Sequence, residues 1–275
     1  MMLSPSLELV VLENPSEADF LRGSAQGTRP VLIRGAMSDW PALSKWNIDY
    51  FRRTWGHLLV EVRRTLDKSE ARTLSVAEFM DYVSATEDPD PYYLRNWQFH
   101  LKQPEFLNDY RVLPFFKSWA EAAPPAQNPH FSWVFIGPKN SFSGLHIDVM
   151  NTSAWNAVTV GSKRWFFYPE EQEEYLYNGE VNVFDPDLAE YPKFFNAEPL
   201  VCEQRAGDIV YTPSNWWHAV KNLEPCVSIT ENFVNNLNFE QVQQFLVYNH
   251  MHDELALMQQ LRAAYASGAA ESASS

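Results

Sequence analysis

Short apolar runs follow one another closely between Phe131 and Phe233, separated by Gly, Pro and Asn residues. Such runs, bounded by turn residues, are typical of the strands of a β-barrel or sandwich. Strands do not alternate with long helices here, which argues against a parallel βαβ fold. We expect strands over 131–137, 143–150, 153–160, 163–168, 198–203, 208–213, 216–222 and 226–233.

The flanking regions show mixed patterns. Before the predicted barrel, the spacing indicates a helix over 14–26, strands over 29–35, 57–64 and 90–96, and a helix from the Ser75/Glu78 capping box to about 84. After Asn238, apolar residues at helical spacing predict helices over about 238–266, which either pack on the barrel or form a homodimer face. We therefore expect one domain over 1–266, with its barrel core at about 131–235, and a disordered tail over 267–275.

The composition narrows the class of protein. The chain has 275 residues, of which 45% are hydrophobic and 15% aromatic, as in a globular domain. The formal net charge of −14 disfavours nucleic-acid binding, because an acidic surface repels phosphates. The sequence shows neither a membrane-spanning run nor a secretion signal. Two cysteines, Cys202 and Cys226, fit reduced thiols, and together these features predict a cytoplasmic protein.

The stretch SGLHIDVM places His146 and Asp148 two positions apart. Residues i and i+2 of a strand share a face, so the imidazole and the carboxylate should project together. Burying such a pair costs free energy unless a partner satisfies both groups. A satisfied core histidine is the simpler interpretation of this pattern when it stands alone.

A second histidine, His218, follows Gly207 and Pro213 in AGDIVYTPSNWWHAVKN. If it lies on a neighbouring strand, it completes a face of two histidines and one carboxylate. Non-haem Fe(II) uses this arrangement and keeps three coordination positions for other ligands.

Polar residues on other predicted strands suggest a wetted cavity. Asn156 interrupts an apolar strand, and Lys163 shares a face with Trp165 and Phe167, where an anionic dicarboxylate would pair with it. Taken alone, Lys163 also fits an exposed hairpin lysine. Ser228, Thr230 and Asn232 share one face of the last strand, which faces either solvent or a barrel cavity. Either Tyr92 or Tyr93 is placed to offer a hydroxyl.

These motifs together resemble the Jumonji-C class of cupin oxygenases, which depend on Fe(II) and 2-oxoglutarate. GLHID, TSAWNA, GSKRW, PSNWWHAVKNL and ITENF are most similar to the lysyl hydroxylase branch once called the phosphatidylserine receptor. The likeness is dense over 131–235, weaker over 28–100, and fades after about 240. It implies a mainly β fold, a double-stranded β-helix (cupin or jelly-roll) barrel with N-terminal α/β elements and a C-terminal helical segment. Asn215 departs from the motif, which usually has Gly there.

The resemblance also implies roles for individual residues. His146, Asp148 and His218 match iron ligands, and Lys163 matches the lysine that binds the distal carboxylate of 2-oxoglutarate. Further co-substrate contacts are expected at Tyr93, Ser143, Asn156, Thr230 and Asn232. The cofactors implied are Fe(II), with 2-oxoglutarate and O2 as co-substrates.

The substrate is less well specified. We expect a dioxygenase that hydroxylates a protein or peptide side chain, with Lys or Arg favoured, and demethylation remains open because the site residues are the same. Residues 169–193 carry eight acidic residues and one basic residue, which fits either a rim attracting cationic substrates or a solvated loop. Two alternatives remain: a biosynthetic oxygenase for a small molecule or peptide natural product, and a non-catalytic metal-binding cupin.

Overall fold

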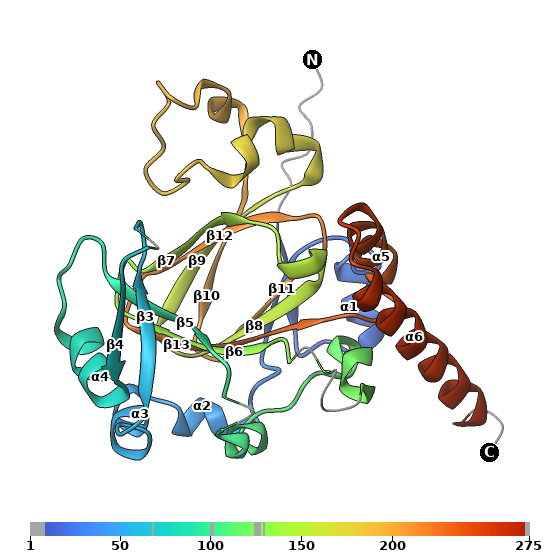
Figure 1. Cartoon of the computed structure of the whole chain (residues 1–275), viewed down its shortest axis with the longest axis horizontal. Helices are drawn as coiled ribbons and strands as arrows, with labels where there is room; N and C mark the ends of the chain where they lie inside the picture. The colour runs from blue at the N-terminus through green and yellow to red at the C-terminus, as the bar shows by residue number, and fades with distance from the viewer. Residues whose placement is uncertain (1–8, 68, 100–101, 124–127, 129, 273–275) are drawn as a thin grey trace.

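Two β-sheets face each other in the computed structural model, which describes residues 9–67, 69–99, 102–123, 128 and 130–272 (Figure 1). The larger sheet has nine strands in the order β1-β2-β11-β8-β13-β6-β5-β3-β4, and the smaller has four in the order β10-β9-β12-β7. Paired strands are antiparallel, apart from the parallel pair β1 and β2. The expected mainly β, jelly-roll fold is confirmed.

The strands agree closely with the periodicity of the sequence, although β1 and β4 were not expected. Their bounds are β1 Val10–Glu13, β2 Val31–Arg34, β3 Leu59–Arg64, β4 Ala71–Ser75, β5 Tyr92–Trp97, β6 Ser132–Gly137, β7 Phe142–His146, β8 Ser153–Val160, β9 Ser162–Tyr168, β10 Leu200–Arg205, β11 Ile209–Thr212, β12 Trp217–Asn222 and β13 Cys226–Phe233.

The helices that flank the sheets are short, apart from α6. The α-helices are α1 Glu17–Gly23, α2 Pro41–Lys45, α3 Ile48–Thr54, α4 Val76–Ala85, α5 Phe239–Tyr248 and α6 His252–Ser272. The 3-10 helices are η1 Pro104–Asn108, η2 Pro114–Phe116, η3 Trp119–Ala122, η4 Val149–Asn151, η5 Glu170–Tyr175, η6 Tyr177–Gly179 and η7 Pro192–Asn196. The expected capping box of Ser75 and Glu78 is present at the start of α4.

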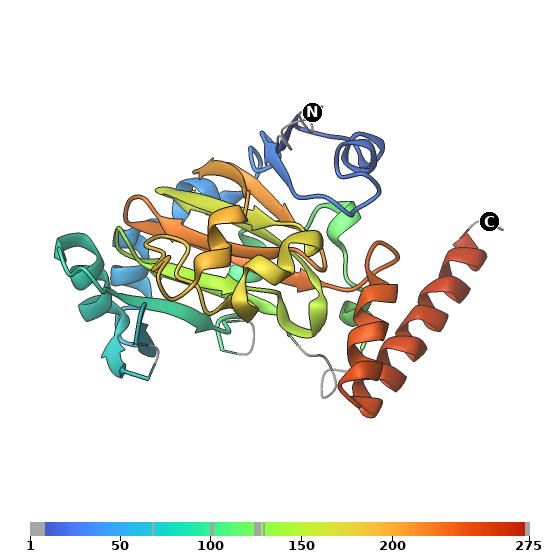
Figure 2. The same cartoon turned by 90° about the horizontal axis from the view of Figure 1, so that it is seen from above.

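The C-terminal helices differ from expectation at their end. Helix α6 continues through Ser272, beyond the expected boundary at 266, into residues for which a disordered tail was expected. Residues 273–275 lie outside the described part of the chain. Helices α5 and α6 pack together with Trp119 through Val242, Leu246 and Met258, and α6 then projects from the barrel (Figures 1 and 2). Packing against the barrel region is therefore observed.

The two faces of the larger sheet have different environments. On the outer face, Trp155, Ile229 and Tyr211 belong to the main apolar core, which α1–α4 cover. On the inner face, Val210 joins Trp165 and Phe167 of the smaller sheet in a second apolar cluster. This cluster fills only part of the interior, and the polar side chains described below occupy the rest.

The acidic segment between β9 and β10 folds into η5, η6 and η7 beside the smaller sheet (Figure 1). Leu176 and Val183 of this segment pack on Leu145, Tyr168 and Ala219, which anchors the segment on the outer face of that sheet. Both cysteines are free thiols, as expected. Within the described residues, no helix combines the length and apolar character that a membrane span requires.

Candidate metal and co-substrate site

Two histidines and an aspartate from separate segments meet between the sheets. His146 ends β7 and pairs with His218 of β12, and their ring centroids are 4.2 Å apart. Asp148 Oδ2 lies 3.9 Å from His218 Nε2, and one ligand atom from each of the three residues lies within 4.8 Å of the others. The strand expected over 143–150 is shorter, because β7 ends at His146 and η4 begins at Val149. Asp148 remains extended and still projects beside His146.

The hydrogen bonds around these residues fit a divalent metal. His146 Nδ1 lies 2.7 Å from the Gly144 carbonyl oxygen, and His218 Nδ1 lies 3.0 Å from that of Trp216. A carbonyl can only accept, so each Nδ1 carries the proton and each Nε2 keeps its lone pair for a ligand. Asp148 Oδ2 is buried without a hydrogen-bond partner among the described residues. A cation would satisfy this oxygen, and two imidazoles with one carboxylate suit non-haem iron.

A β-bulge on β7 determines which of its side chains face inward. His218 pairs with His146, whereas Val220, two residues further along β12, pairs with Ser143, three residues back along β7. The extra residue changes the alternation, so Ser143 and His146 face the interior together despite their odd spacing. Ser143, expected near the co-substrate, is half-buried on this inner face.

Two asparagines hold together the segments that carry Asp148 and His218. Asn215 donates its backbone N–H to Asn151 Oδ1 at 2.7 Å, and Asn151 Nδ2 donates to Asn215 Oδ1. Ser214 Oγ also donates to the Asn151 carbonyl oxygen at 2.6 Å. Asn215 has a φ of 65°, a conformation that asparagine tolerates better than most residues, which explains why it replaces the usual glycine.

Lys163 lies on β9, opposite Asn222 of β12, and its side chain is buried between the two sheets. Only 1% of its surface is exposed. Its Nζ donates to Asn222 Oδ1 at 2.9 Å and to the Tyr93 hydroxyl at 3.2 Å. Burial lowers the pKa of the Lys163 ammonium, but Cys226 and Tyr93 raise it, and the net shift is upward. Burial raises the pKa of the Cys226 thiol, and the nearby Lys163 ammonium opposes this shift. No carboxylate of the described residues forms an ion pair with Lys163, which leaves its charge available for an anion.

Polar groups also line the inner face of β8 and β13. Asn156 Nδ2 donates to Thr230 Oγ1 at 2.6 Å, and Asn156 Oδ1 is buried with no partner in the part of the chain that the structure describes. Asn232 lies further along the same face of β13 and donates to Thr152 Oγ1 at 2.9 Å. The expected wetted face of β13 is therefore an interior surface.

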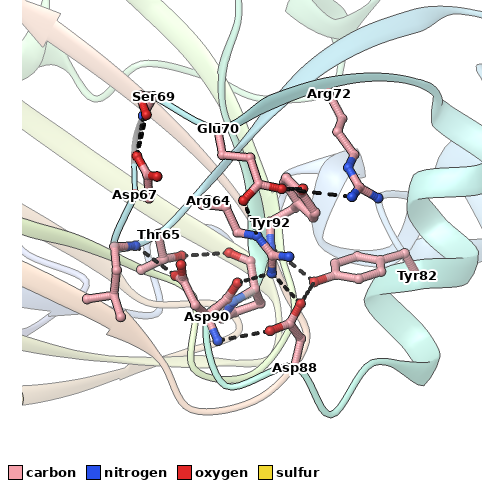
Figure 3. Close-up of polar contacts among 12 residues, drawn as sticks. Arg64, Thr65, Asp67, Ser69, Glu70, Arg72, Tyr82, Asp88, Asp90 and Tyr92 are labelled. Atoms are coloured by element: carbon pink, nitrogen blue, oxygen red, sulfur yellow. Dashed lines mark hydrogen bonds and ion pairs between the residues drawn. The ribbon is translucent and has the colours of Figure 1, made fainter.

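Tyr92 and Tyr93 project to opposite faces of β5, which settles which of them enters the site. Tyr93 reaches Lys163, whereas the Tyr92 hydroxyl donates to Glu70 and its ring stacks under Arg64, with Cζ 4.3 Å from the ring centroid. Arg64 also pairs with Asp88, so this network ties β3, β4 and the entry to β5 together (Figure 3). It fixes the start of the strand that carries Tyr93.

The sequence places Asn222 in the motif that contains His218, but the sequence-based expectations gave neither Asn222 nor Asn151 a role in the site. Asn222 is 1% exposed, and besides accepting from Lys163 it donates to Ser141 Oγ at 2.8 Å. Its position two residues after Val220 and four after His218 puts it on their face of β12, and this alternation could have identified it. Asn151 left no such signal, because its role depends on a contact with Asn215, far away in the sequence.

Comparisons with known proteins agree on the family to which the chain belongs. A model of the cupin-like domain matches residues 17–239. The chain is similar to the lysine-specific demethylase JMJ21 of Arabidopsis thaliana, with 32% identity over 225 residues, covering 77% of this chain and 24% of that protein. It is similar to the bifunctional arginine demethylase and lysyl-hydroxylase psr-1 of Caenorhabditis elegans, with 26% identity covering 85% of this chain and 63% of that protein.

A third relative is the human 2-oxoglutarate and iron-dependent oxygenase JMJD4, with 29% identity covering 84% of this chain and 62% of that protein. The chain thus spans less than two thirds of the length of each of these relatives. The resemblance to Jumonji-C oxygenases noted in the sequence is confirmed.

Proposed function

We propose that this chain, which belongs to the family of cupin-like domains, is an Fe(II)- and 2-oxoglutarate-dependent oxygenase that oxidises a side chain of a protein substrate. The observation that carries the proposal is that the side chains of the three candidate metal ligands and the buried ammonium of Lys163 face the same interior. Lys163 pairs with Asn222, and Phe167 pairs with His218, so the two parts of the site lie four residues apart along paired strands. At the usual rise, this separation is roughly 13 Å of backbone.

The residues divide into two groups by role. His146, Asp148 and His218 hold the metal through two Nε2 atoms and the otherwise unpartnered Asp148 oxygen. Lys163 binds the distal carboxylate of 2-oxoglutarate, and Tyr93 and Asn222 hold the ammonium in place. An ammonium with only neutral hydrogen-bond partners gains a strong, charge-assisted interaction when a carboxylate enters.

Polar groups on β8 and β13 complete the co-substrate pocket. Asn156 and Thr230 are hydrogen-bonded to each other, and the free Asn156 carbonyl oxygen can accept a further bond. Ser143 and Asn232 contribute polar side chains from opposite sheets. A bound metal, with 2-oxoglutarate and O2 as co-substrates, would supply the oxidative chemistry, and succinate and CO2 would be released alongside the oxidised substrate. The chain's own part is to position these groups and to exclude water.

Succinate formation tests the proposal. The wild-type chain should convert 2-oxoglutarate to succinate in the presence of Fe(II), and candidate peptides that are substrates should increase the rate. His146→Ala and Asp148→Ala should each reduce the rate by roughly a hundredfold or more, since changes even in outer-shell partners cost up to that much. Asp253→Ala, at an exposed aspartate of α6 outside this site and outside the inserted segment, is the control. Full turnover in the Asp148→Ala variant would reject the ligand assignment.

We further propose that the substrate side chain is cationic, a lysine or arginine of a protein. All eight acidic residues of 169–193 are exposed, and among described residues only Glu174 has a basic partner, Lys193 at 3.8 Å. Glu170 also accepts a hydrogen bond from Asn215, which links the segments that carry Asp148 and His218. The acidic segment therefore begins beside the candidate metal ligands. Its field would raise the local concentration of a cationic substrate.

Replacing Glu171, Glu173 and Glu174 by lysine should raise the Michaelis constant for a cationic peptide in a salt-dependent manner, leaving basal succinate formation unchanged. An unchanged Michaelis constant would contradict a role of the acidic segment 169–193 in binding the substrate.

Mass spectrometry of products from peptide and metabolite libraries distinguishes a protein substrate from a small one, and hydroxylation from demethylation. The homodimer expected through α5 and α6 stays a prediction, which sedimentation of the wild-type chain tests.

A further inference from the structure

Strands β3 and β5 lie on the side of the barrel remote from α5 and α6 (Figure 1). Residues of both strands line a cleft there. Their pairing is limited to Arg63 with Tyr93 and Arg64 with Tyr92. Where this pairing stops, a cavity of about 640 Å³ lies between Leu59 and Glu61 of β3 and Arg95 of β5. This volume is in the range of ligand-binding pockets.

The cleft shares a wall with the proposed active site. Tyr93 lines the cleft and also accepts the hydrogen bond of Lys163. Arg95 lies two residues further along the same face of β5, roughly 7 Å away at the usual strand rise. A ligand in this cleft would therefore lie next to the co-substrate pocket without entering it.

Arg95 has an unusual electrostatic environment. It is partly buried, and no carboxylate among the described residues forms an ion pair with it. Its guanidinium stacks 5.9 Å from the Tyr93 ring centroid. Burial lowers the pKa of Arg95, and the neighbouring Arg63 lowers it further, although the attraction of Tyr93 opposes this.

The other charged groups of the cleft do not neutralise Arg95. Glu61 is engaged by Arg63, whose Nη2 lies 2.7 Å from Glu61 Oε1. Lys102 adds a further positive charge to the lining. Arginine stays protonated at physiological pH, so the cleft keeps a net positive charge although the whole chain has a formal net charge of −14.

We propose that the β3–β5 cleft binds an acidic side chain of the protein substrate, a few residues away from the one that is oxidised, and that Arg95 is the specificity-determining residue. The inference rests on the proposed function for the identity of the occupant. A planar guanidinium recognises a carboxylate with two parallel hydrogen bonds, which would satisfy the desolvated charge of Arg95. The cleft is also larger than a single carboxylate needs, which fits a polypeptide segment.

Such a substrate would carry opposite charges on residues a few positions apart. The acidic segment 169–193 attracts the cationic residue, whereas the cleft selects an acidic residue close to it. Sequences with only basic residues would then be poor substrates, because they leave Arg95 buried and unpaired. The cleft would thus discriminate against basic sequences, because binding them leaves the charge of Arg95 without a partner.

Direct binding tests the inference with two synthetic peptides, each with a central lysine, flanked by glutamates in one and by glutamines in the other. Fluorescence anisotropy should show that the wild-type chain binds the glutamate peptide about tenfold more tightly, as expected for one charge-assisted hydrogen-bonded pair. Arg95→Gln should abolish this preference, whereas Arg111→Gln, at a 76% exposed arginine paired with Asp39, should keep it. Equal binding of both peptides by the wild type, or an unchanged preference in Arg95→Gln, would overturn the proposal.

Thermal unfolding of the same variants separates this site from the proposed oxygenase site. Arg95→Gln should be as stable as the wild type or more stable without ligand, because it removes a desolvated charge, and 2-oxoglutarate with Mn(II) should stabilise both equally. If the glutamate preference depends on Arg95 but 2-oxoglutarate has no effect on the wild type, the anion site stands and the oxygenase assignment fails. If 2-oxoglutarate stabilises both and the preference is absent, the anion site alone is refuted.

Discussion

Asp148 Oδ2 lies 3.9 Å from His218 Nε2 and accepts no hydrogen bond from any described residue. Both histidines use Nδ1 to contact backbone carbonyl oxygens. On these rings, only a protonated Nε2 could therefore donate a hydrogen bond to Asp148 Oδ2. A buried carboxylate oxygen without a partner is destabilising, and a bound cation relieves this cost. Metal binding should therefore contribute directly to the stability of the fold.

This relationship predicts a metal-dependent unfolding temperature. Mn(II) at a hundred times its dissociation constant should stabilise the wild-type chain by about 2.7 kcal/mol, and a chelator should reverse the effect. Asp148→Ala should unfold at the same or a higher temperature without metal and gain little from its addition. Calorimetry with Asp253→Ala as the control measures this. A metal response in Asp148→Ala equal to that of the wild type would contradict the prediction.

The left-handed conformation of Asn215 predicts an unusual order of substitutions. Asn215→Ala should destabilise the chain by roughly 1–3 kcal/mol, because alanine is strained at this φ and cannot bond Asn151 or Glu170 through a side chain. Asn215→Gly loses the same side-chain bonds without the strain and should be less damaging. Urea unfolding of both variants measures the difference, and a glycine variant less stable than the alanine variant would refute the assignment of strain.

Much of this site was accessible from the sequence because strands alternate with a period of two. His146, Asp148, Asn156, Lys163, Thr230 and His218 were selected from alternation and motif resemblance, and the structure brings them to one interior. Their roles as ligands and co-substrate contacts remain predictions. Lys163 shows the value of this combination, because its local sequence also fitted an exposed hairpin lysine.

The features that sequence reasoning missed depend on interruptions of regular structure. The bulge that turns Ser143 inward shifts the alternation of β7 and leaves no local signature. The early end of β7 and the contact of Asn151 with Asn215 arise from the turn at η4. Strands β1 and β4 were missed because each is a short edge strand of the larger sheet, with four and five residues, which leaves few positions to establish an alternation.

The adjacent tyrosines of β5 predict separable effects of the same chemical change. Tyr93→Phe removes the hydroxyl that accepts from Lys163, and should weaken 2-oxoglutarate binding about fivefold with little change in stability. Tyr92→Phe removes the bond to Glu70 in the network of Figure 3, and should cost about 1 kcal/mol of stability without changing 2-oxoglutarate affinity. Titration calorimetry and urea unfolding of both variants provide the two measurements. Reversed effects would contradict the assignment of Tyr93 to the site.

Glu231 lies between Thr230 and Asn232 but points to the opposite, apolar face of β13, where it accepts a hydrogen bond from the Tyr110 hydroxyl. Burial raises the pKa of this carboxyl from 4.5 to about 7, although the bond from Tyr110 opposes the shift. The folded chain therefore holds a proton on Glu231 at pH values where the unfolded chain has lost it.

The sign of this shift predicts that stability falls as pH rises. Between about pH 4.5 and 7 the folded state binds more protons at Glu231 than the unfolded state, so each increase in pH favours unfolding, and the loss is complete above pH 7. The total is at most about 3 kcal/mol from this group. Glu231→Gln keeps an acceptor for Tyr110 without a charge, and should remove this contribution and be more stable than the wild type at pH 8. Urea unfolding across this range measures both curves, and parallel curves for the two proteins would show that Glu231 does not titrate as proposed.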